Sequence, residues 1–133
     1  MGITFDESLH TGNELIDSQH QELINRVNKL ADSISTTKEK NVAIQTLDFL
    51  MDYTDFHFSA EEKLQEEAGY PQLTAHKKQH ADFVKAVNDL KEMLEEEEGP
   101  SDAFVEAVNR NITEWLVNHI QGWDKKVAEF IRG

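Results

Sequence analysis

Apolar residues recur along this chain at alternating steps of four and three, which is the spacing of one face of an α-helix. Four segments show the pattern, and glycine and proline interrupt it at 69–71 and 99–100. The inward positions of the first two segments are Ile16, His20, Leu23, Val27, Leu30 and Ile34, then Ala43, Leu47, Leu50, Thr54, His57, Glu61 and Leu64. Those of the last two are Leu73, His76, His80, Phe83, Val87, Leu90 and Leu94, then Val105, Val108, Ile112, Trp115 and His119. Each face needs a partner, so the sequence predicts an all-α protein, an antiparallel up-down four-helix bundle.

Residues 1–15 carry no helical stripe, and we expect them to form an N-terminal arm that lies on the bundle through Phe5, Leu9 and Leu15. The length of 133 residues is typical of one domain, so a single domain over 1–133 is predicted.

Three signals mark helix ends. Ser18 with Gln21 resembles a capping box, and Ser101 precedes the fourth segment as an N-cap. Gly69 can adopt the left-handed conformation that ends the second segment.

Charge and composition narrow the function. Thirteen basic and twenty-six acidic residues give a net charge of −13, which repels phosphate backbones, so nucleic acid is not an expected partner. No apolar run approaches the roughly 20 residues of a membrane helix. The first residues also lack the features of a secretion signal, so we predict no membrane association and a cytoplasmic location. The chain has no cysteine, which leaves histidine and carboxylate as its strong metal ligands.

Polar residues occupy several inward positions. Apart from Thr54, they are five of the six histidines and one glutamate: His20, His57, His76, His80, His119 and Glu61. A lone histidine in a core is more often a hydrogen-bonded structural residue than a ligand. Five together with a buried carboxylate indicate metal, because that charge would cost several kcal/mol to bury without a cation. The sixth, His10, lies in the arm and is expected at the surface.

The spacing of these residues supports a metal site. His57 and Glu61 are four residues apart, as are His76 and His80, so each pair projects from one side of a helix. Five imidazoles with one or two carboxylates exceed the ligands of one tetrahedral zinc, and a mixed nitrogen and oxygen set suits octahedral iron or manganese. Two metals that share carboxylate bridges fit this count.

Four fragments, in this order and across nearly the whole chain, resemble the hemerythrin family. They are 16–23 around His20, 57–62 with His57 and Glu61, 76–80 with His76 and His80, and 119–124 with His119 and Asp124. The resemblance implies two iron ions (Fe2+/Fe3+) joined by a bridging oxide or hydroxide.

The resemblance also implies a role for each ligand. His76, His80 and His119 would hold one iron, and His20 and His57 would hold the other. Glu61 and Asp124 would bridge both, and dioxygen would bind reversibly at an open position of the second iron.

An apolar pocket is expected over that open position. The matching residues are Leu23, Phe58, Trp115, Leu116 and Ile120. Plain core packing is the alternative explanation for each of them. Apolar walls would exclude water and protons and so slow oxidation to the inert ferric state. The arm departs from the family at Phe5, where tryptophan is common.

The resemblance therefore implies reversible dioxygen binding, for carriage, storage or delivery, and not an enzyme. The alternatives are oxygen or redox sensing and a weak di-iron oxidase or peroxidase. Di-iron oxidases use more carboxylates, usually in Glu-x-x-His pairs, and none of the five inward histidines has a glutamate three residues before it. Dioxygen is the one partner predicted, and the sequence identifies no protein partner.

The position of Asp124 poses a geometric problem. It lies five residues after His119, and five residues of a regular α-helix advance about 140° beyond a full turn. A widened turn of the π type, eased by Gly122, would return both side chains to one face. The alternative is a carboxylate that approaches the metals from the side.

Overall fold

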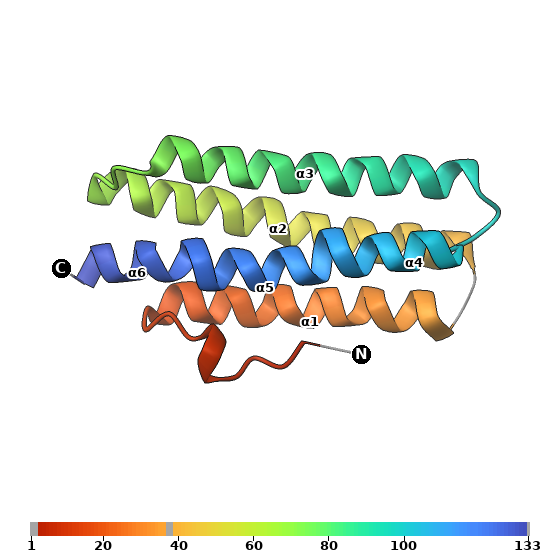
Figure 1. The fold of residues 1–133 in the computed structure, drawn as a ribbon, viewed down its shortest axis with the longest axis horizontal. Coiled ribbons are helices and arrows are strands. Elements are labelled where there is room, and N and C mark those ends of the chain that lie inside the picture. Colours follow the sequence, from red (N-terminus) through yellow and green to blue (C-terminus); the bar gives the residue numbers. More distant parts are fainter. Residues whose placement is uncertain (1–2, 37–38, 133) are drawn as a thin grey trace.

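Four helical rods lie side by side and alternate in direction (Figure 1). The computed structural model describes residues 3–36 and 39–132. The first three rods are α1 (Glu14–Thr36), α2 (Lys40–Ala68) and α3 (Leu73–Glu96). The fourth is a continuous run of α4 (Asp102–Val108), η2 (Asn109–Glu114), α5 (Trp115–His119), η3 (Ile120–Asp124) and α6 (Lys125–Arg132). The predicted antiparallel four-helix bundle is confirmed.

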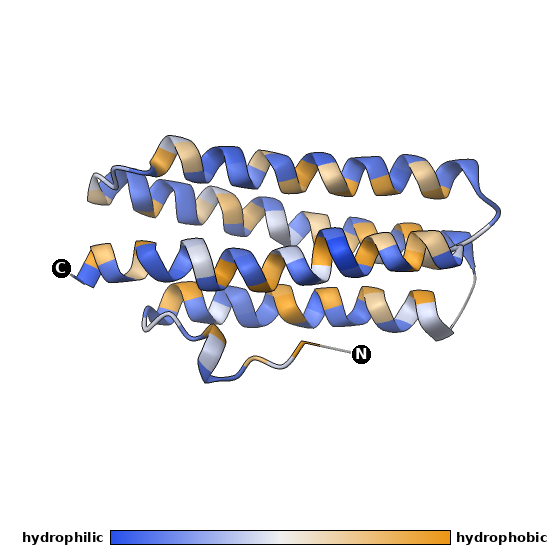
Figure 2. Cartoon of the chain, in the orientation of Figure 1, coloured by the Kyte–Doolittle hydropathy of each residue, from blue (hydrophilic) through white to orange (hydrophobic). Residues whose placement is uncertain are grey.

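The apolar faces meet in one main core. Figure 2 shows apolar residues recurring at intervals along every helix among more numerous polar ones. All the predicted inward positions of α1 are buried, and those of α2 and α3 are buried except Leu64 and Leu73, which are half-buried. Among the residues that the structure describes, no helix has the length and apolar character needed to cross a membrane.

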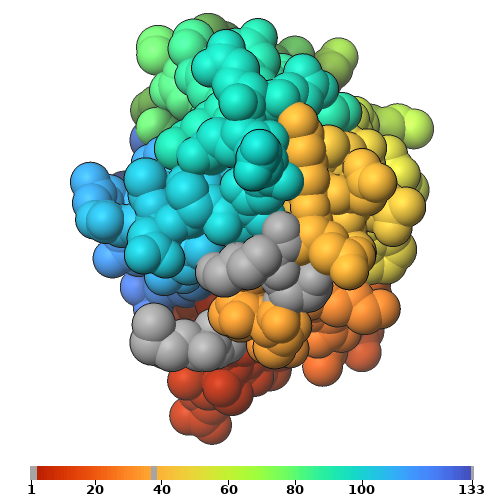
Figure 3. Space-filling view, turned by 90° about the vertical axis from the view of Figure 1, so that its right-hand side faces the viewer, coloured from red at the N-terminus to blue at the C-terminus, as the bar shows by residue number. Residues whose placement is uncertain are grey.

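The end of the bundle that carries the connection between α3 and α4 faces the viewer in Figure 3. There the Lys40 ammonium, at the start of α2, donates a hydrogen bond of 2.6 Å to the backbone oxygen of Glu95. This contact joins two segments 55 residues apart and holds the second helix against the end of the third.

Helix α1 starts earlier than the predicted capping box. Asn13 precedes the helix, and its side-chain oxygen accepts a hydrogen bond of 3.0 Å from the backbone N–H of Ile16. Ser18 lies inside the helix, where its hydroxyl donates to the Leu15 carbonyl. The capping box of Ser18 and Gln21 was therefore wrong, because asparagine is an equally strong N-cap and comes first along the chain.

The other two helix-end signals are confirmed. The hydroxyl oxygen of Ser101 accepts a hydrogen bond of 3.1 Å from the Phe104 N–H at the start of α4. Gly69 ends α2 with φ +70°, and Tyr70 N–H donates back to the Gln65 carbonyl. A left-handed residue followed by this back-bonded amide is the Schellman type of helix end.

The arm packs on the bundle through Leu9, Phe5 and Ile3, and not through Leu15. Leu9 is buried in a short 3-10 turn, η1 (Glu7–Leu9), and Phe5 packs against the main core. Leu15 is 53% exposed, so its predicted packing was wrong: it already belongs to α1, where its neighbour Ile16 takes the inward position. His10 is exposed, as predicted.

Two π-helical turns, η2 and η3, interrupt the fourth rod. The turn η3 spans the interval between His119 and Asp124, which confirms the first of the two explanations for their spacing. The turn η2 was not expected, and the inward stripe differs accordingly: Val105 and Trp115 are half-buried, whereas Phe104 is fully buried.

The buried residues of this rod explain both π turns. Besides His119 and Val127, they fall at every fourth position: Phe104, Val108, Ile112, Leu116, Ile120, Asp124 and Ala128. In a regular α-helix four residues advance about 400°, so a strict four-residue repeat drifts by about 40° at each step. A π turn has more residues per turn, so it cancels part of the drift and keeps the repeat facing the core.

Candidate metal centre

Seven side chains from all four rods meet in the bundle interior, and each is no more than 3% exposed. They are His20 of α1, His57 and Glu61 of α2, His76 and His80 of α3, His119 of α5 and Asp124 of η3. They form two overlapping groups that could each hold a metal ion, with potential ligand atoms within 4.8 Å of one another. The structure thus brings together all seven residues that the sequence singled out.

Glu61 faces two sets of histidines with its two oxygens. Its Oε1 lies 2.9 Å from Nε2 of His76 and 3.2 Å from Nε2 of His80. Its Oε2 lies on the side of α1, 3.6 Å from Nε2 of His57 and 3.9 Å from Nε2 of His20. A carboxylate with one oxygen toward each set can bridge two cations.

Asp124 repeats this arrangement from the opposite rod. Its Oδ1 lies 3.1 Å from Nε2 of His76 and 3.2 Å from Nε2 of His119. Its Oδ2 lies 2.7 Å from Nε2 of His20. The π turn η3 is what carries this fully buried side chain to the same face as His119.

The cluster therefore has two unequal halves. The three-histidine half comprises His76, His80 and His119, with Glu61 Oε1 and Asp124 Oδ1. The two-histidine half comprises His20 and His57, with the other oxygen of each carboxylate. The second half offers one protein ligand fewer than the first.

Opposite charges hold the two buried carboxylates ionised. Burial and Asp124 raise the pKa of Glu61, but interaction with the imidazoles of His76 and His80 outweighs them and lowers it. Burial also raises the pKa of Asp124, yet His119 and His20 hold it well below its usual range.

The histidines differ among themselves. Burial lowers the pKa of His57 to about 4, so that ring is neutral near pH 7. Burial also lowers the pKa of His76, but Asp124 and Glu61 outweigh it and raise the value to about 9. His57 and His76 thus differ in the charge that they carry near pH 7.

Several buried nitrogen and oxygen atoms of the cluster have no hydrogen-bond partner, as expected for atoms that bind a metal ion. Among the described residues, both oxygens of Glu61 and of Asp124 are buried without a hydrogen-bond partner, as are Nε2 of His20 and of His80. Buried polar atoms are nearly always hydrogen-bonded, and such exceptions mark functional sites or ions. Imidazole nitrogen with carboxylate oxygen is a donor set that suits iron or manganese, so the cluster could hold metal ions.

A family comparison identifies the group of proteins to which this site belongs. The family model described as the Hemerythrin HHE cation binding domain matches residues 11–131. This chain belongs to the hemerythrin family.

Individual hemerythrin relatives agree with that assignment. A bacteriohemerythrin of Stenotrophomonas maltophilia is 34% identical over 131 residues, which are 98% of this chain and 82% of that protein. A bacteriohemerythrin of Methylococcus capsulatus is 35% identical over 109 residues, 82% of this chain and 80% of its own. A myohemerythrin of Theromyzon tessulatum is 31% identical over 122 residues, 92% of this chain and 88% of its own.

Crystal structures of hemerythrin share the fold. The wild-type protein is 31% identical, and the match has a TM-score of 0.80 over 92% of each chain. A single-residue variant is 29% identical and matches over the full length of both chains with a TM-score of 0.86.

Three polar residues behind the clustered imidazoles were missed by the sequence analysis. They make the pairs His57–Gln19 at 2.7 Å, His76–Gln65 at 3.2 Å and His80–Glu62 at 2.8 Å, each through the ring Nδ1. In His57 and His80 the ring Nδ1 faces an oxygen acceptor and donates its proton, and this tautomer leaves Nε2 free for metal. Gln65 instead presents its amide nitrogen to His76. Gln65 follows Glu61 by four residues, so helical spacing alone could have placed it on the inward face.

The predicted pocket residues belong to the main core or pack against it. Leu23, Phe58, Leu116 and Ile120 are buried and Trp115 is half-buried. Phe58 stacks on His80 with ring centroids 3.8 Å apart, and Trp115 stacks on His119 at 4.4 Å. Both aromatic rings thus cover the three-histidine half, and Phe58 also approaches His57 at 6.0 Å.

Proposed function

We propose that this hemerythrin-family chain holds two iron ions in the seven-residue cluster and binds dioxygen reversibly. One observation carries the proposal: Glu61 and Asp124 each direct one carboxylate oxygen toward the three-histidine half and the other oxygen toward the two-histidine half. When bound, a di-iron centre supplies the electrons that dioxygen takes up on binding and returns on release.

The two halves have different parts in this proposal. The three-histidine half offers five protein donor atoms, three imidazole nitrogens and two carboxylate oxygens. The two-histidine half, with His20 and His57, offers four. Since octahedral coordination requires six ligands, the two-histidine half leaves more room for an external ligand, and we assign dioxygen binding to it.

The surrounding residues favour binding over catalysis. Leu23 follows His20 by three residues, and Leu116 precedes His119 by three, so each buried leucine lies within one helical turn of a ligand. Apolar side chains there exclude water and limit the supply of protons to bound oxygen. Within residues 3–36 and 39–132, every buried histidine and carboxylate belongs to this cluster, and we therefore propose an oxygen carrier, store or donor.

The test is metal content together with reversible oxygenation. The purified chain is loaded with ferrous iron, its iron is quantified, and its visible spectrum is followed through repeated cycles of air and vacuum. We expect two irons per chain and an absorption band that appears and disappears with oxygen. One iron per chain, or a band that does not reverse, would contradict the proposal.

A further inference from the structure

A carboxylate lies directly behind one of the metal-facing imidazoles. Nδ1 of His80 on α3 donates a hydrogen bond of 2.8 Å to Oε2 of Glu62 on α2. At the same ring position the other four imidazoles of the cluster have either a neutral amide or no hydrogen-bond partner within residues 3–36 and 39–132. The three-histidine half is therefore the half that has an outer negative charge bonded to a ligand.

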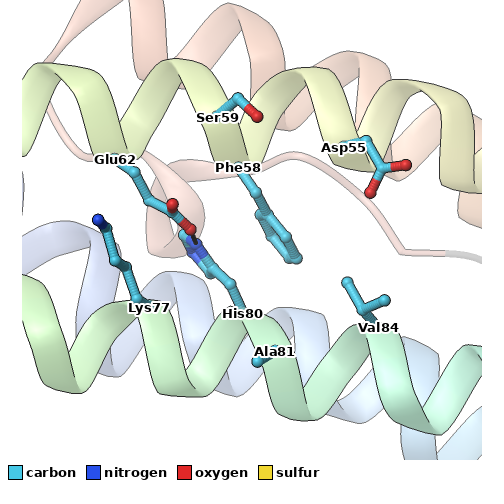
Figure 4. A pocket seen from close by; sticks show the side chains of 8 residues that line it. All are labelled: Asp55, Phe58, Ser59, Glu62, Lys77, His80, Ala81 and Val84. Carbon is cyan, nitrogen blue, oxygen red and sulfur yellow. Dashed lines mark hydrogen bonds and ion pairs between the residues drawn. The ribbon is translucent and has the colours of Figure 1, made fainter.

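Glu62 lies where the cluster comes nearest to a surface groove. The groove, of about 400 Å³, runs between α2 and α3, and Figure 4 shows Glu62 reaching across it to the ring of His80. The Glu62 side chain is 26% exposed, whereas that of His80 is 3% exposed. Glu62 thus joins a buried ligand to the solvent-facing side of the bundle.

Two contacts of different kinds hold the His80 ring. Phe58 stacks on its face with an interplanar angle of 2°, and Glu62 bonds to its edge. Stacking fixes the plane of a ring but does not select which nitrogen carries the proton. The hydrogen bond to Glu62 makes that selection, because a carboxylate accepts and cannot donate.

A carboxylate behind a ligand imidazole also changes the metal that the imidazole binds. It draws on the Nδ1 proton and makes Nε2 a stronger donor, and its charge favours the more positive oxidation state of the ion. A neutral amide at the same place has a weaker effect, since hydrogen bonds to an ionised group are roughly twice as strong.

We propose that Glu62 is a positioning residue of the metal centre: through His80 it strengthens metal binding at the three-histidine half and favours the ferric state. This inference rests on the proposed di-iron function. It assigns the two halves different electronic character, because the outer partner of His57 is the neutral Gln19.

Two isosteric substitutions test the inference. Glu62→Gln keeps the shape of the side chain and removes its charge. Asp55→Asn removes the same charge from the same groove, where Asp55 is exposed and does not bond to His80, and so serves as the matched control. For each variant, zinc affinity is measured by competition with a chelator, and reduction potential is measured on the iron-loaded protein.

We expect Glu62→Gln to weaken zinc binding tenfold to a hundredfold, the usual effect of losing an outer-shell partner. Glu62→Gln should also raise the reduction potential, because the ferric state loses the support of the negative charge. A tenfold weaker preference for ferric over ferrous iron corresponds to a one-electron potential higher by about 59 mV. Asp55→Asn should change zinc affinity less than twofold. As a readout on the parent protein, nuclear magnetic resonance of the zinc-loaded form should show a slowly exchanging Nδ1–H on His80.

Equal shifts in the two variants would overturn the inference, since they would indicate a general charge effect. No shift in either, or a His80 ring without a protected Nδ1–H, would also overturn it. A parent protein that binds neither zinc nor iron would overturn the metal site itself and this inference with it. If the parent protein binds metal and Glu62→Gln has the same zinc affinity and reduction potential as the parent, this inference is overturned but the metal site is not.

Discussion

Replacing Leu116 by alanine tests whether an apolar wall beside His119 keeps water from the proposed metal centre. Leu116 is 3% exposed and belongs to the main core. Truncating a buried leucine to alanine costs about 2–5 kcal/mol, because the transfer energy is lost and a cavity remains. For 133 residues the entropy of unfolding is about 280 cal/mol/K, so a loss of about 3 kcal/mol lowers Tm by about 10 °C.

The content of the new cavity decides the functional effect. Water enters a cavity only where polar atoms can bind it, and an apolar cavity stays dry. Leu116 lies within one helical turn of His119, so we expect a cavity there to border the polar atoms of the cluster. Leu94 is fully buried in the same core at the last turn of α3, so Leu94→Ala gives a similar loss of stability with a dry cavity.

The assay compares autoxidation of the oxygenated protein in the parent, Leu116→Ala and Leu94→Ala, with Tm measured in parallel. We expect Leu116→Ala to oxidise at least tenfold faster, which corresponds to a barrier lower by about 1.4 kcal/mol, and Leu94→Ala to stay within twofold of the parent. Equal acceleration in both variants would show that lost stability controls the rate. Unchanged rates in Leu116→Ala, and in Leu23→Ala as a second wall variant, would show that the pocket is misplaced.

Three other changes test separate parts of the account. Asp124→Asn removes one oxygen ligand, so a metal titration should show one tightly held ion per chain; two ions held with parental affinity would refute a bridging role. If the loaded protein is kept at a free metal concentration of a thousand times Kd, removing the metal with a chelator should lower the free energy of unfolding by about 4 kcal/mol. The same Tm with and without chelator would contradict metal binding to the folded state. Ser101→Ala removes the cap on Phe104 N–H and should lower the free energy of unfolding by about 1 kcal/mol, which thermal unfolding would show as a Tm lower by roughly 4 °C. An unchanged Tm would show that the cap does not stabilise the fold.

The first three helices could be predicted from the sequence because their apolar positions follow regular helical spacing. Every inward residue listed for α1 is buried, from Ile16 to Ile34. Local capping was harder to read, because Asn13 and Ser18 are both good N-cap residues and only the course of the arm decides between them. The exposure of Leu15 follows from that earlier start.

The fourth helix was only partly predictable. Alternating steps of four and three placed Val105 inward, whereas the structure buries Phe104 and continues at every fourth residue. The signal was present in the chain as seven suitable residues spaced by four from Phe104 to Ala128. A regular helix cannot keep such a repeat on one face, so the spacing itself predicts widened turns.

For the site too, helical spacing predicted some residues, whereas others are brought to it only by the packing of the helices. The inward histidines and Glu61 were readable because polar residues interrupt apolar stripes. The partners Gln19 and Glu62 stand next to ligands along the chain, at positions that a helical period assigns to the flank, and only the packing of neighbouring helices turns them toward an imidazole. Asp124 required the resemblance to hemerythrin, because its spacing from His119 contradicts a regular helix.

The most direct test of the di-iron centre is anomalous X-ray diffraction at the iron edge from crystals of the iron-loaded chain. We predict two anomalous peaks within the cluster, one bound by His76, His80 and His119 and the other by His20 and His57, with Glu61 and Asp124 bound to both. A single peak, or two peaks that Asp124 does not join, would contradict the central claim.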